Sequence, residues 1–324
     1  MPHAILVKQP GGPDQLAWEK VKVGDPGTGQ VRIRQTAIGL NFIDVYHRTG
    51  LYPQPGPFIP GVEGAGVIES VGAEVDGLKQ GDRVAYAGPI GGYAEERLIA
   101  ADRLVKLPDD ISDEQAAAML LQGMTVDMLI RSVWPIHSGD TILIHAAAGG
   151  VGLIMCQWAA ALGATVIGAV SSDEKAELAR AHGCHHPIVY SKQDFVAEVD
   201  RLTAGKKLPV VFDSVGRDTF VRSLDCLQKR GLMVSFGQAS GPVEPFVPNL
   251  LAQKGSLYLT RPTLFDYVST REELERSAAS LFDAVRTGKV KVDIGQRFPL
   301  SEAAQAHRAL EARQTVGSTI LTVA

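Results

Sequence analysis

The sequence predicts an α/β protein of two domains, one rich in short strands and loops and the other a doubly wound parallel sheet. The chain has 324 residues, which is enough for two domains of ordinary size. Residues 1–110 hold 17 of the 34 glycines and 10 of the 18 prolines. After Asp109, short apolar runs alternate with helix-compatible segments, which is typical of a parallel sheet covered by helices on both faces.

The glycine- and proline-rich region is predicted to contain short strands between closely spaced turns. The expected strands are residues 4–8, 30–35, 66–71, 82–87 and 93–99. Because turns follow one another so closely, we expect little helix there.

The second region opens with a helical pattern from Ser112 to about Trp134. Apolar runs follow at residues 141–147, 165–170, 187–190, 209–213, 231–236 and 256–260. Short, continuously apolar strands between helices predict a doubly wound nucleotide-binding domain.

The C-terminal region contains a helical segment at 271–287, a second helix at 301–312 and an apolar strand at 318–323. It fits neither pattern cleanly, and we expect it to return to the first domain. The expected division is therefore residues 1–124 with 264–324 for the first domain, and residues 125–263 for the second.

A glycine-rich turn from His145 to Gly152 lies between an apolar strand and a helical run. Aligned with Gly-x-Gly-x-x-Gly, it has Ala147 at the first position, then Gly149 and Gly152. Such a turn lets the backbone approach a pyrophosphate and aims helix N–H groups at its charge. With a second apolar strand starting at Thr165, the turn predicts dinucleotide binding rather than packing alone.

The end of the strand at 165–170 bears on which dinucleotide fits. An NAD site usually has an acidic residue there for the ribose 2′-hydroxyl. Here Ser171 and Ser172 follow, and then Lys175, a set that suits a 2′-phosphate. The pattern favours NADP. The alternatives are that the serines only cap the next helix, and that Asp173 selects NAD.

Composition argues against several other classes. The formal net charge is −4 with no block of like charge, so nothing points to nucleic acid or an anionic membrane. Three cysteines, Cys156, Cys184 and Cys226, form no C-x-x-C pair, which indicates a reducing compartment. We expect a cytoplasmic protein. An uncharged stretch at 141–172 has the length of a membrane span, but its glycines predict strand, turn, helix and strand.

Motifs for other chemistry are missing. The sequence has no Tyr-x-x-x-Lys pair and no phosphate loop of the Gly-x-x-x-x-Gly-Lys-Ser/Thr type. One cluster of metal-ligating residue types, residues 182–186, consists of neighbours that project apart. We expect a solvated turn there and no metal site.

A set of motifs carries a family resemblance. Residues 61–72, which include Glu63, and residues 81–84 resemble the signature of the medium-chain dehydrogenase/reductase superfamily. Together with segments 41–44, 146–152, 212–216, 231–237 and 255–262, they make the chain similar to the zeta-crystallin-like NADPH:quinone oxidoreductases over essentially its whole length. The resemblance implies a GroES-like β-rich catalytic domain and a Rossmann domain that binds NADPH.

Departures from the zinc-bearing alcohol dehydrogenases of that superfamily bear on mechanism. Those proteins have Gly-His-Glu where this chain has Gly61-Val62-Glu63, and a cysteine ligand where Asn41 precedes Asp44. Their four-cysteine zinc loop has no counterpart. We therefore expect a metal-free transfer of hydride to an acceptor that needs little polarisation, such as a quinone or enone.

The resemblance also implies a cofactor site. The 2′-phosphate would be held by Ser171, Ser172, Lys175, Tyr190 and Arg313, and the pyrophosphate would lie against Gly150 and Val151. The nicotinamide half would be lined by Gly237, Gln238, Ala239, Ser240, Thr263, Leu264 and Phe265, with Phe42, Ile43, Asp44, Met128 and Val215 near the cofactor. For Arg313, the alternative is a solvated arginine at a helix end.

On the acceptor side we expect uncharged hydrogen-bond donors in a cleft. The candidates are Asn41, Tyr46, Tyr52 and Thr125, with Gln122 as a weaker addition. For the two tyrosines the alternative is simple packing in a proline-rich loop. No pair of histidine and carboxylate indicates a general acid, so the proton donor is unassigned.

Three functions are compatible with these residues. The first is a flavin-free quinone reductase, and the second is an NADPH-dependent reductase of enones, alkenals or enoyl thioesters. The third is a non-catalytic NADPH-binding protein, like relatives that serve as lens crystallins or bind RNA; the acidic balance counts against RNA. Because segment 255–262 resembles an edge strand that joins two cofactor domains, we also expect a homodimer.

Overall fold

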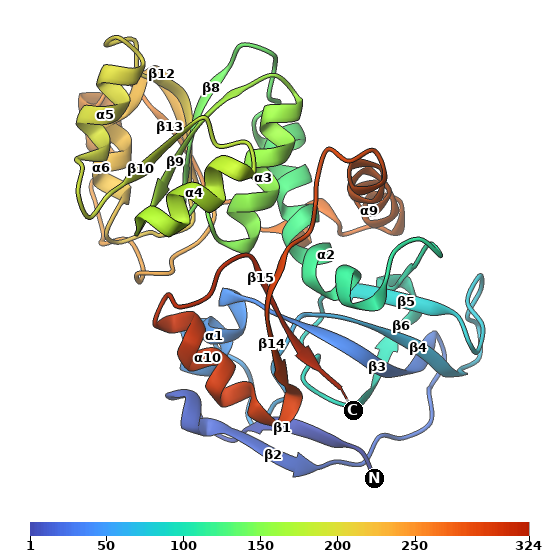
Figure 1. The fold of residues 1–324 in the computed structure, drawn as a ribbon. Coiled ribbons are helices and arrows are strands. Elements are labelled where there is room, and N and C mark those ends of the chain that lie inside the picture. The colour runs from blue at the N-terminus through green and yellow to red at the C-terminus, as the bar shows by residue number, and fades with distance from the viewer. Residues whose placement is uncertain (324) are drawn as a thin grey trace. The chain divides into compact units, whose positions relative to one another are not determined.

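The computed structural model describes residues 1–323 and divides the chain into two compact units (Figure 1). The first unit comprises Met1–Met124, Val268–Asp283 and the described residues from Val292 onward, and the second comprises Thr125–Tyr267 and Ala284–Lys291. Residues 264–267 and 284–291, expected in the first domain, fold with the second instead. One reason is that Gln157 of the second unit exchanges two hydrogen bonds with the backbone of Lys291, at 3.0 and 2.8 Å.

The first unit is built on a seven-stranded sheet and a separate pair of strands. The pair is β1 (His3–Val7) and β2 (Leu16–Lys20), and the sheet contains β3 (Gln30–Leu40), β4 (Glu63–Val71), β5 (Arg83–Ala87), β6 (Glu96–Ala100), β7 (Val105–Lys106), β14 (Ile294–Pro299) and β15 (Ser318–Thr322). The strand order is β14-β15-β3-β4-β5-β7, and β6 also pairs with β3. Because the C-terminal strand β15 pairs with β3, the chain does return to the first unit at its end.

Helices of this unit include α1 (Phe42–Thr49) and α10 (Ala303–Glu311). Helix α2 (Asp113–Asp127) begins in it, and α9 (Arg271–Arg286) belongs to it as far as Asp283. A π-helical turn, Met128–Val133, continues α2. Together Asp113–Val133 are long and apolar enough to span a membrane by composition, but 72% of that window is buried inside the protein, as in a core helix.

The expectation of little helix in residues 1–110 missed α1. Asn41 occupies the N-cap, and its backbone N–H donates to the carboxylate of Asp44 at 2.9 Å. Gly50 ends the helix in the left-handed region at φ 81°. These local signals outweigh the average density of glycine and proline around them.

The second unit is a six-stranded parallel sheet between helices. Its strands are β8 (Thr141–His145), β9 (Thr165–Val170), β10 (His186–Val189), β11 (Leu208–Asp213), β12 (Leu227–Ser235) and β13 (Tyr258–Thr260), in the order β10-β9-β8-β11-β12-β13. Its helices are α3 (Gly150–Ala161), α4 (Asp173–Ala181), α5 (Phe195–Leu202), α6 (Phe220–Asp225), α7 (Asn249–Gln253) and α8 (Leu264–Tyr267). The strand order reverses after β10, so right-handed crossovers put α3 and α4 on one face and α5 and α6 on the other. The uncharged stretch 141–172 is strand, turn, helix and strand, as predicted.

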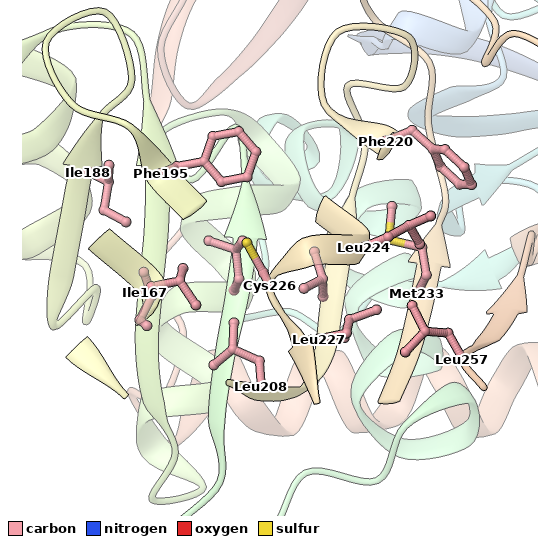
Figure 2. Packing of buried hydrophobic residues seen from close by; sticks show 13 residues of the cluster. Ile167, Ile188, Phe195, Leu208, Phe220, Leu224, Cys226, Leu227, Met233 and Leu257 are labelled. Carbon is pink, nitrogen blue, oxygen red and sulfur yellow. The ribbon is translucent and has the colours of Figure 1, made fainter. Parts of the chain in front are cut away.

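Apolar side chains from the sheet and from α5 and α6 form one hydrophobic core cluster of the second unit (Figure 2). Phe195, Phe220 and Leu224 of the helices pack with Ile167 and Met233 of the strands. Burial of each such side chain contributes about 1.5–3 kcal/mol. This cluster holds the strands in place, and the loops after β9, β11 and β12 follow from their C-terminal ends.

Candidate active site and cofactor site

Asn41 and Glu63 form a buried polar pair in the first unit. The Asn41 amide nitrogen donates to Glu63 Oε2 at 2.6 Å, and the backbone N–H of Leu121 donates to Glu63 Oε1 at 2.7 Å. The carboxylate occupies the space beside Gly39, because a Cβ there would lie 2.7 Å from the carboxyl carbon. The glycine on β3 thus makes room for the acid at the start of β4.

Two further side chains extend this pair into a chain of hydrogen bonds. Gln122 donates to Asn41 Oδ1 at 3.1 Å, and the hydroxyl of Ser318 donates to Gln122 Oε1 at 2.8 Å. All four residues are buried, and they come from the N-cap of α1, from β4, from α2 and from β15. The structure therefore brings the predicted residue Asn41 together with Gln122, and adds Glu63 and Ser318, which the sequence analysis did not assign to the site.

Burial raises the pKa of Glu63 to about 8, although the hydrogen bonds from Asn41 and Leu121 favour its charged form. Asp44 is also fully buried, and desolvation raises the pKa of its carboxyl to about 7. The side chain of Asp44 holds the backbone of Asn41 and accepts a hydrogen bond from the Tyr93 hydroxyl at 2.9 Å. In the structure, the predicted cofactor residue Asp44 thus holds the backbone of Asn41 in place through a hydrogen bond.

A second buried relay ends on Asp44. The Arg48 guanidinium can only donate, so His307 Nδ1 accepts from it at 3.2 Å and Nε2 carries the hydrogen. Nε2–H then faces the Tyr93 hydroxyl at 3.1 Å, and that hydroxyl donates to Asp44. Arg48 also forms a two-pronged ion pair with Glu311 at 2.7 and 2.9 Å. Burial, and secondarily the Arg48 charge, lowers the pKa of His307 to about 3.

Aromatic rings gather on α1 and the loop after it. The rings of Tyr46 and Tyr52 meet edge to face at 5.2 Å, and the ring of Phe42 lies 6.2 Å from that of Tyr46. The backbone N–H of Tyr52 donates to the carbonyl of Tyr46 at 3.0 Å. The two predicted acceptor-side tyrosines are therefore neighbours, and the predicted residue Ile43 is on the same helix as Tyr46.

The glycine turn of the second unit has the form that a pyrophosphate requires. Ala146 adopts a left-handed conformation at φ 55°, and α3 begins at Gly150, with Val151 as its next residue. A Cβ on Gly152 would lie 2.7 Å from the Ala147 Cα, so only glycine fits there. The first N–H groups of a helix lack intrahelical partners and can bind an anion. The residues present thus fit a dinucleotide.

The predicted 2′-phosphate residues of the second unit lie near one another at the ends of β9 and β10. Ser172 is the N-cap of α4, where its hydroxyl accepts from the backbone N–H of Lys175 at 3.3 Å. Ser191 donates to the carbonyl of Ser171 at 3.2 Å, and Tyr190 precedes it. Ser172 thus caps α4 through its hydroxyl oxygen.

Lys192 belongs to this group and was missed from the sequence. Its ammonium forms an ion pair with Asp173, which neutralises the carboxylate that the sequence left as an argument for NAD. Lys192 follows β10, 19 residues after Asp173, so no local pattern connects them. Arg313 lies in the first unit, where its backbone follows α10 with φ 59° and donates to the carbonyl of Leu310.

The loops after β11 and β12 are joined by hydrogen bonds. Asp213 accepts from the backbone N–H groups of Val215 and Gly216 at 2.7 and 3.1 Å. Val215 in turn accepts from the hydroxyl of Ser240 at 2.8 Å, and the N–H of Ala239 donates to the carbonyl of Ser214 at 3.1 Å. These bonds bring together predicted nicotinamide-side residues of the second unit: Val215, Gly237, Gln238, Ala239 and Ser240.

The remaining predicted residues of the second unit are Thr125, Met128, Thr263, Leu264 and Phe265. Met128 and Leu264 are buried, whereas the Phe265 ring is 37% exposed. Met128 and Leu264 are therefore available mainly for packing, and Phe265 for contact with a ligand.

Among residues 1–323, no group of three or more His, Cys, Asp or Glu side chains is arranged to hold a metal ion. In the cluster at 182–186, His185 Nδ1 accepts from the backbone of Val166 at 3.0 Å, and His182 Nδ1 faces the carbonyl of Leu178 at 2.7 Å. Their ring nitrogens are therefore directed to different backbone groups.

Comparison with known proteins agrees with this architecture. The model for "Alcohol dehydrogenase GroES-like domain" matches residues 27–109, and that for "Zinc-binding dehydrogenase" matches residues 150–281. The chain is 55% identical over 313 residues to a quinone oxidoreductase of Pseudomonas aeruginosa, covering 96% of each chain. It is 48% identical over 330 residues to a 2-haloacrylate reductase of a Burkholderia species, covering 99% of each. The structure of Escherichia coli quinone oxidoreductase complexed with NADPH matches at a TM-score of 0.98 and 47% identity, covering 99% of this chain and 100% of that one.

A GroES-like unit and a Rossmann-type unit in one chain define a reductase of the medium-chain dehydrogenase/reductase type. The first unit contains the buried amide of Asn41, and the second contains the glycine turn that fits a dinucleotide. Within that class, the full-length identity to several quinone oxidoreductases is decisive. The chain belongs to the quinone oxidoreductase family.

Proposed function

We propose that the protein is an oxidoreductase that reduces quinones with NADPH, without flavin or zinc. The observation that carries this proposal is the full-length similarity to quinone oxidoreductases, one of which binds NADPH in the same fold. The Rossmann turn and the basic residues beside Ser171 and Ser172 fit that cofactor.

NADPH supplies a hydride when it is bound. The protein must then orient the planar acceptor and place a hydrogen-bond donor at the oxygen on which negative charge develops. Asn41 has one amide N–H bound to Glu63, and its second N–H is the donor that we assign to that oxygen. The rings of Tyr46 and Tyr52 offer an aromatic surface against which a planar quinone packs.

We assign the 2′-phosphate to Ser171, Ser172, Lys175, Tyr190 and Arg313. Lys192 contributes by pairing with Asp173, which offsets the negative charge of that carboxylate beside the assigned phosphate site. A charge-assisted hydrogen bond is worth about 1.5–3 kcal/mol, or roughly a 10- to 100-fold change in affinity.

The test is oxidation of NADPH and of NADH by the purified protein with 1,4-benzoquinone, a naphthoquinone, a simple enone and 2-chloroacrylate. We expect saturable quinone reduction that prefers NADPH, and Arg313→Ala should raise the KM for NADPH at least 10-fold without raising that for NADH. Arg308→Ala is the matched control, because Arg308 lies on α10, five residues before Arg313, and is paired with Asp14. Equal use of both nucleotides by the wild type would contradict the assigned phosphate site.

A second candidate is reduction of an activated carbon–carbon double bond. The 48% identity to a 2-haloacrylate reductase favours it, because the same hydride geometry serves a conjugated acid or enone. Turnover of 2-chloroacrylate or the enone with none of the quinones would establish this function in place of the first.

We also propose that the protein is a cytoplasmic homodimer. Strand β13 is at the edge of the second unit's sheet, and its Tyr258 and Leu259 are 63% and 36% exposed. An apolar sheet edge of this kind needs a cover, and a second copy of β13 would supply one. Light scattering should give the mass of a dimer, and a monomer mass independent of concentration would refute the pairing. The three cysteines are free and buried, as in proteins of a reducing compartment.

A further inference from the structure

The hydrogen-bond chain from Ser318 to Glu63 has a direction, and a backbone group fixes it. Leu121 N–H faces Glu63 Oε1, and a backbone N–H can only donate. Glu63 Oε1 must therefore always accept. If Glu63 takes up a proton, that proton must sit on Oε2, which is the oxygen that faces Asn41.

The proton on Oε2 forces the Asn41 amide to turn over. Asn41 now places its nitrogen toward Glu63 and its oxygen toward Gln122. A protonated Glu63 donates from Oε2, so Asn41 must present its oxygen there and its nitrogen to Gln122. Gln122 then accepts from Asn41 and donates to the Ser318 hydroxyl, which can rotate to accept. Every bond in the chain is kept, and every one is reversed.

We propose that Glu63, Gln122 and Ser318 are positioning residues that hold the amide nitrogen of Asn41 toward the acceptor oxygen, and that a proton on Glu63 turns it away. The proposal rests on the proposed function, in which Asn41 covers the developing charge of the acceptor. In the reversed orientation an amide oxygen replaces the nitrogen beside Glu63. A lone pair there repels the same charge, and loss of one such donor lowers kcat about 10²- to 10³-fold.

Charged and titratable groups around Glu63 come from three elements. Asp44 on α1 raises the pKa of Glu63 through its negative charge, Tyr86 is on β5, and Tyr93 precedes β6. Burial raises the pKa of both phenols above their ordinary value, so both stay neutral when Glu63 ionises. The groups from β3 and α2 beside Glu63 are Gly39 and the backbone of Leu120 and Leu121, which do not titrate.

The test is the rate of hydride transfer as a function of pH, with NADPH deuterated at the transferred position to show that this step is being measured. In the wild type the rate should rise up to about 10-fold per pH unit below the pKa of Glu63, which burial places at about 8, and level off above it. Glu63→Gln must place its NH₂ toward Asn41, because Leu121 still donates to the other side. It should therefore show a low rate, about 10²-fold below the wild-type plateau and independent of pH, with an unchanged KM for NADPH.

Ser318→Ala and Gln122→Leu test the rest of the chain. Each should lower the plateau rate several-fold, and Thr319→Val is the matched control, because Thr319 is the next residue on β15 and bonds to Gln296 instead. Wild-type rate and pH profile in Glu63→Gln would overturn the proposal, and if that variant does not fold, the same result in Gln122→Leu would do so. Asn41→Ala distinguishes the proposed function from the positioning proposal. Full activity in this variant would refute the donor role of Asn41. Loss of activity in this variant, with wild-type activity in the Glu63, Gln122 and Ser318 variants, would refute only the positioning role of those three residues.

Discussion

His307 should make the first unit lose stability in acid, and His307→Gln should remove that loss. The ring is buried with Arg48 on one nitrogen and the Tyr93 hydroxyl on the other. A second ring proton would have to sit on Nδ1, directly against an arginine N–H. Glutamine can present an oxygen to Arg48 and an NH₂ to Tyr93 without titrating.

The magnitude follows from the pKa of His307, which falls from 6.5 in the unfolded chain to about 3 in the folded one. Between these values the unfolded state binds more protons, so the stabilising contribution is complete above pH 6.5 and is lost as pH falls. Each pH unit is worth about 1.4 kcal/mol, so roughly 2 kcal/mol should be lost between pH 6.5 and about pH 5. Asp44 and Glu63, whose pKa values are raised, act in the opposite sense, so only the difference between wild type and variant isolates His307.

The assay is urea unfolding followed through Trp18, which lies in the first unit, in a chain with Trp134→Phe and Trp158→Phe. The difference in unfolding free energy, wild type minus His307→Gln, should shrink by roughly 2 kcal/mol from pH 6.5 to about pH 5. His137→Gln is the control, because that side chain is 78% exposed and makes the same change outside the network. A difference that stays constant across this pH range would refute the reasoning.

Three other changes should have distinct effects. Gly39→Ala should lower the thermal unfolding temperature by overpacking Glu63, at a cost of about 1–3 kcal/mol, whereas Gly12→Ala, with no atom within 4 Å of its Cβ, should not. Lys192→Ala should raise the KM for NADPH roughly 2- to 5-fold, and adding Asp173→Asn should restore it; kinetics with NADH check that the effect belongs to the phosphate. Asp213→Ala removes the acceptor of two backbone N–H groups and two hydroxyls in the segment that follows β11, and should weaken NADPH binding in titration calorimetry.

Much of the parallel sheet could be predicted from the sequence, because its signal is local. A strand buried on both faces must be apolar throughout, and Thr165–Val170 was predicted from end to end on that basis. Strand β14 escaped prediction because its six residues alternate between half-buried and exposed positions at a sheet edge. Its partner β15 is buried and was found. The strands β14 and β15 differ in burial, and only a buried strand needs the apolar residues by which it can be predicted.

The site was predictable only where residue type alone carries the chemistry. Asn41 could be named from the family resemblance, because it precedes Asp44 by three residues, but its partner Gln122 is 81 residues away and Ser318 lies 196 residues beyond Gln122. No periodicity links them, since the sheet and α2 bring them together only after folding. The decisive group is the Leu121 N–H, a backbone atom that has no signature in any sequence. Because it can only donate, it leaves the Asn41 amide one orientation for each protonation state of Glu63, so side-chain identity alone cannot determine the chemistry of this site.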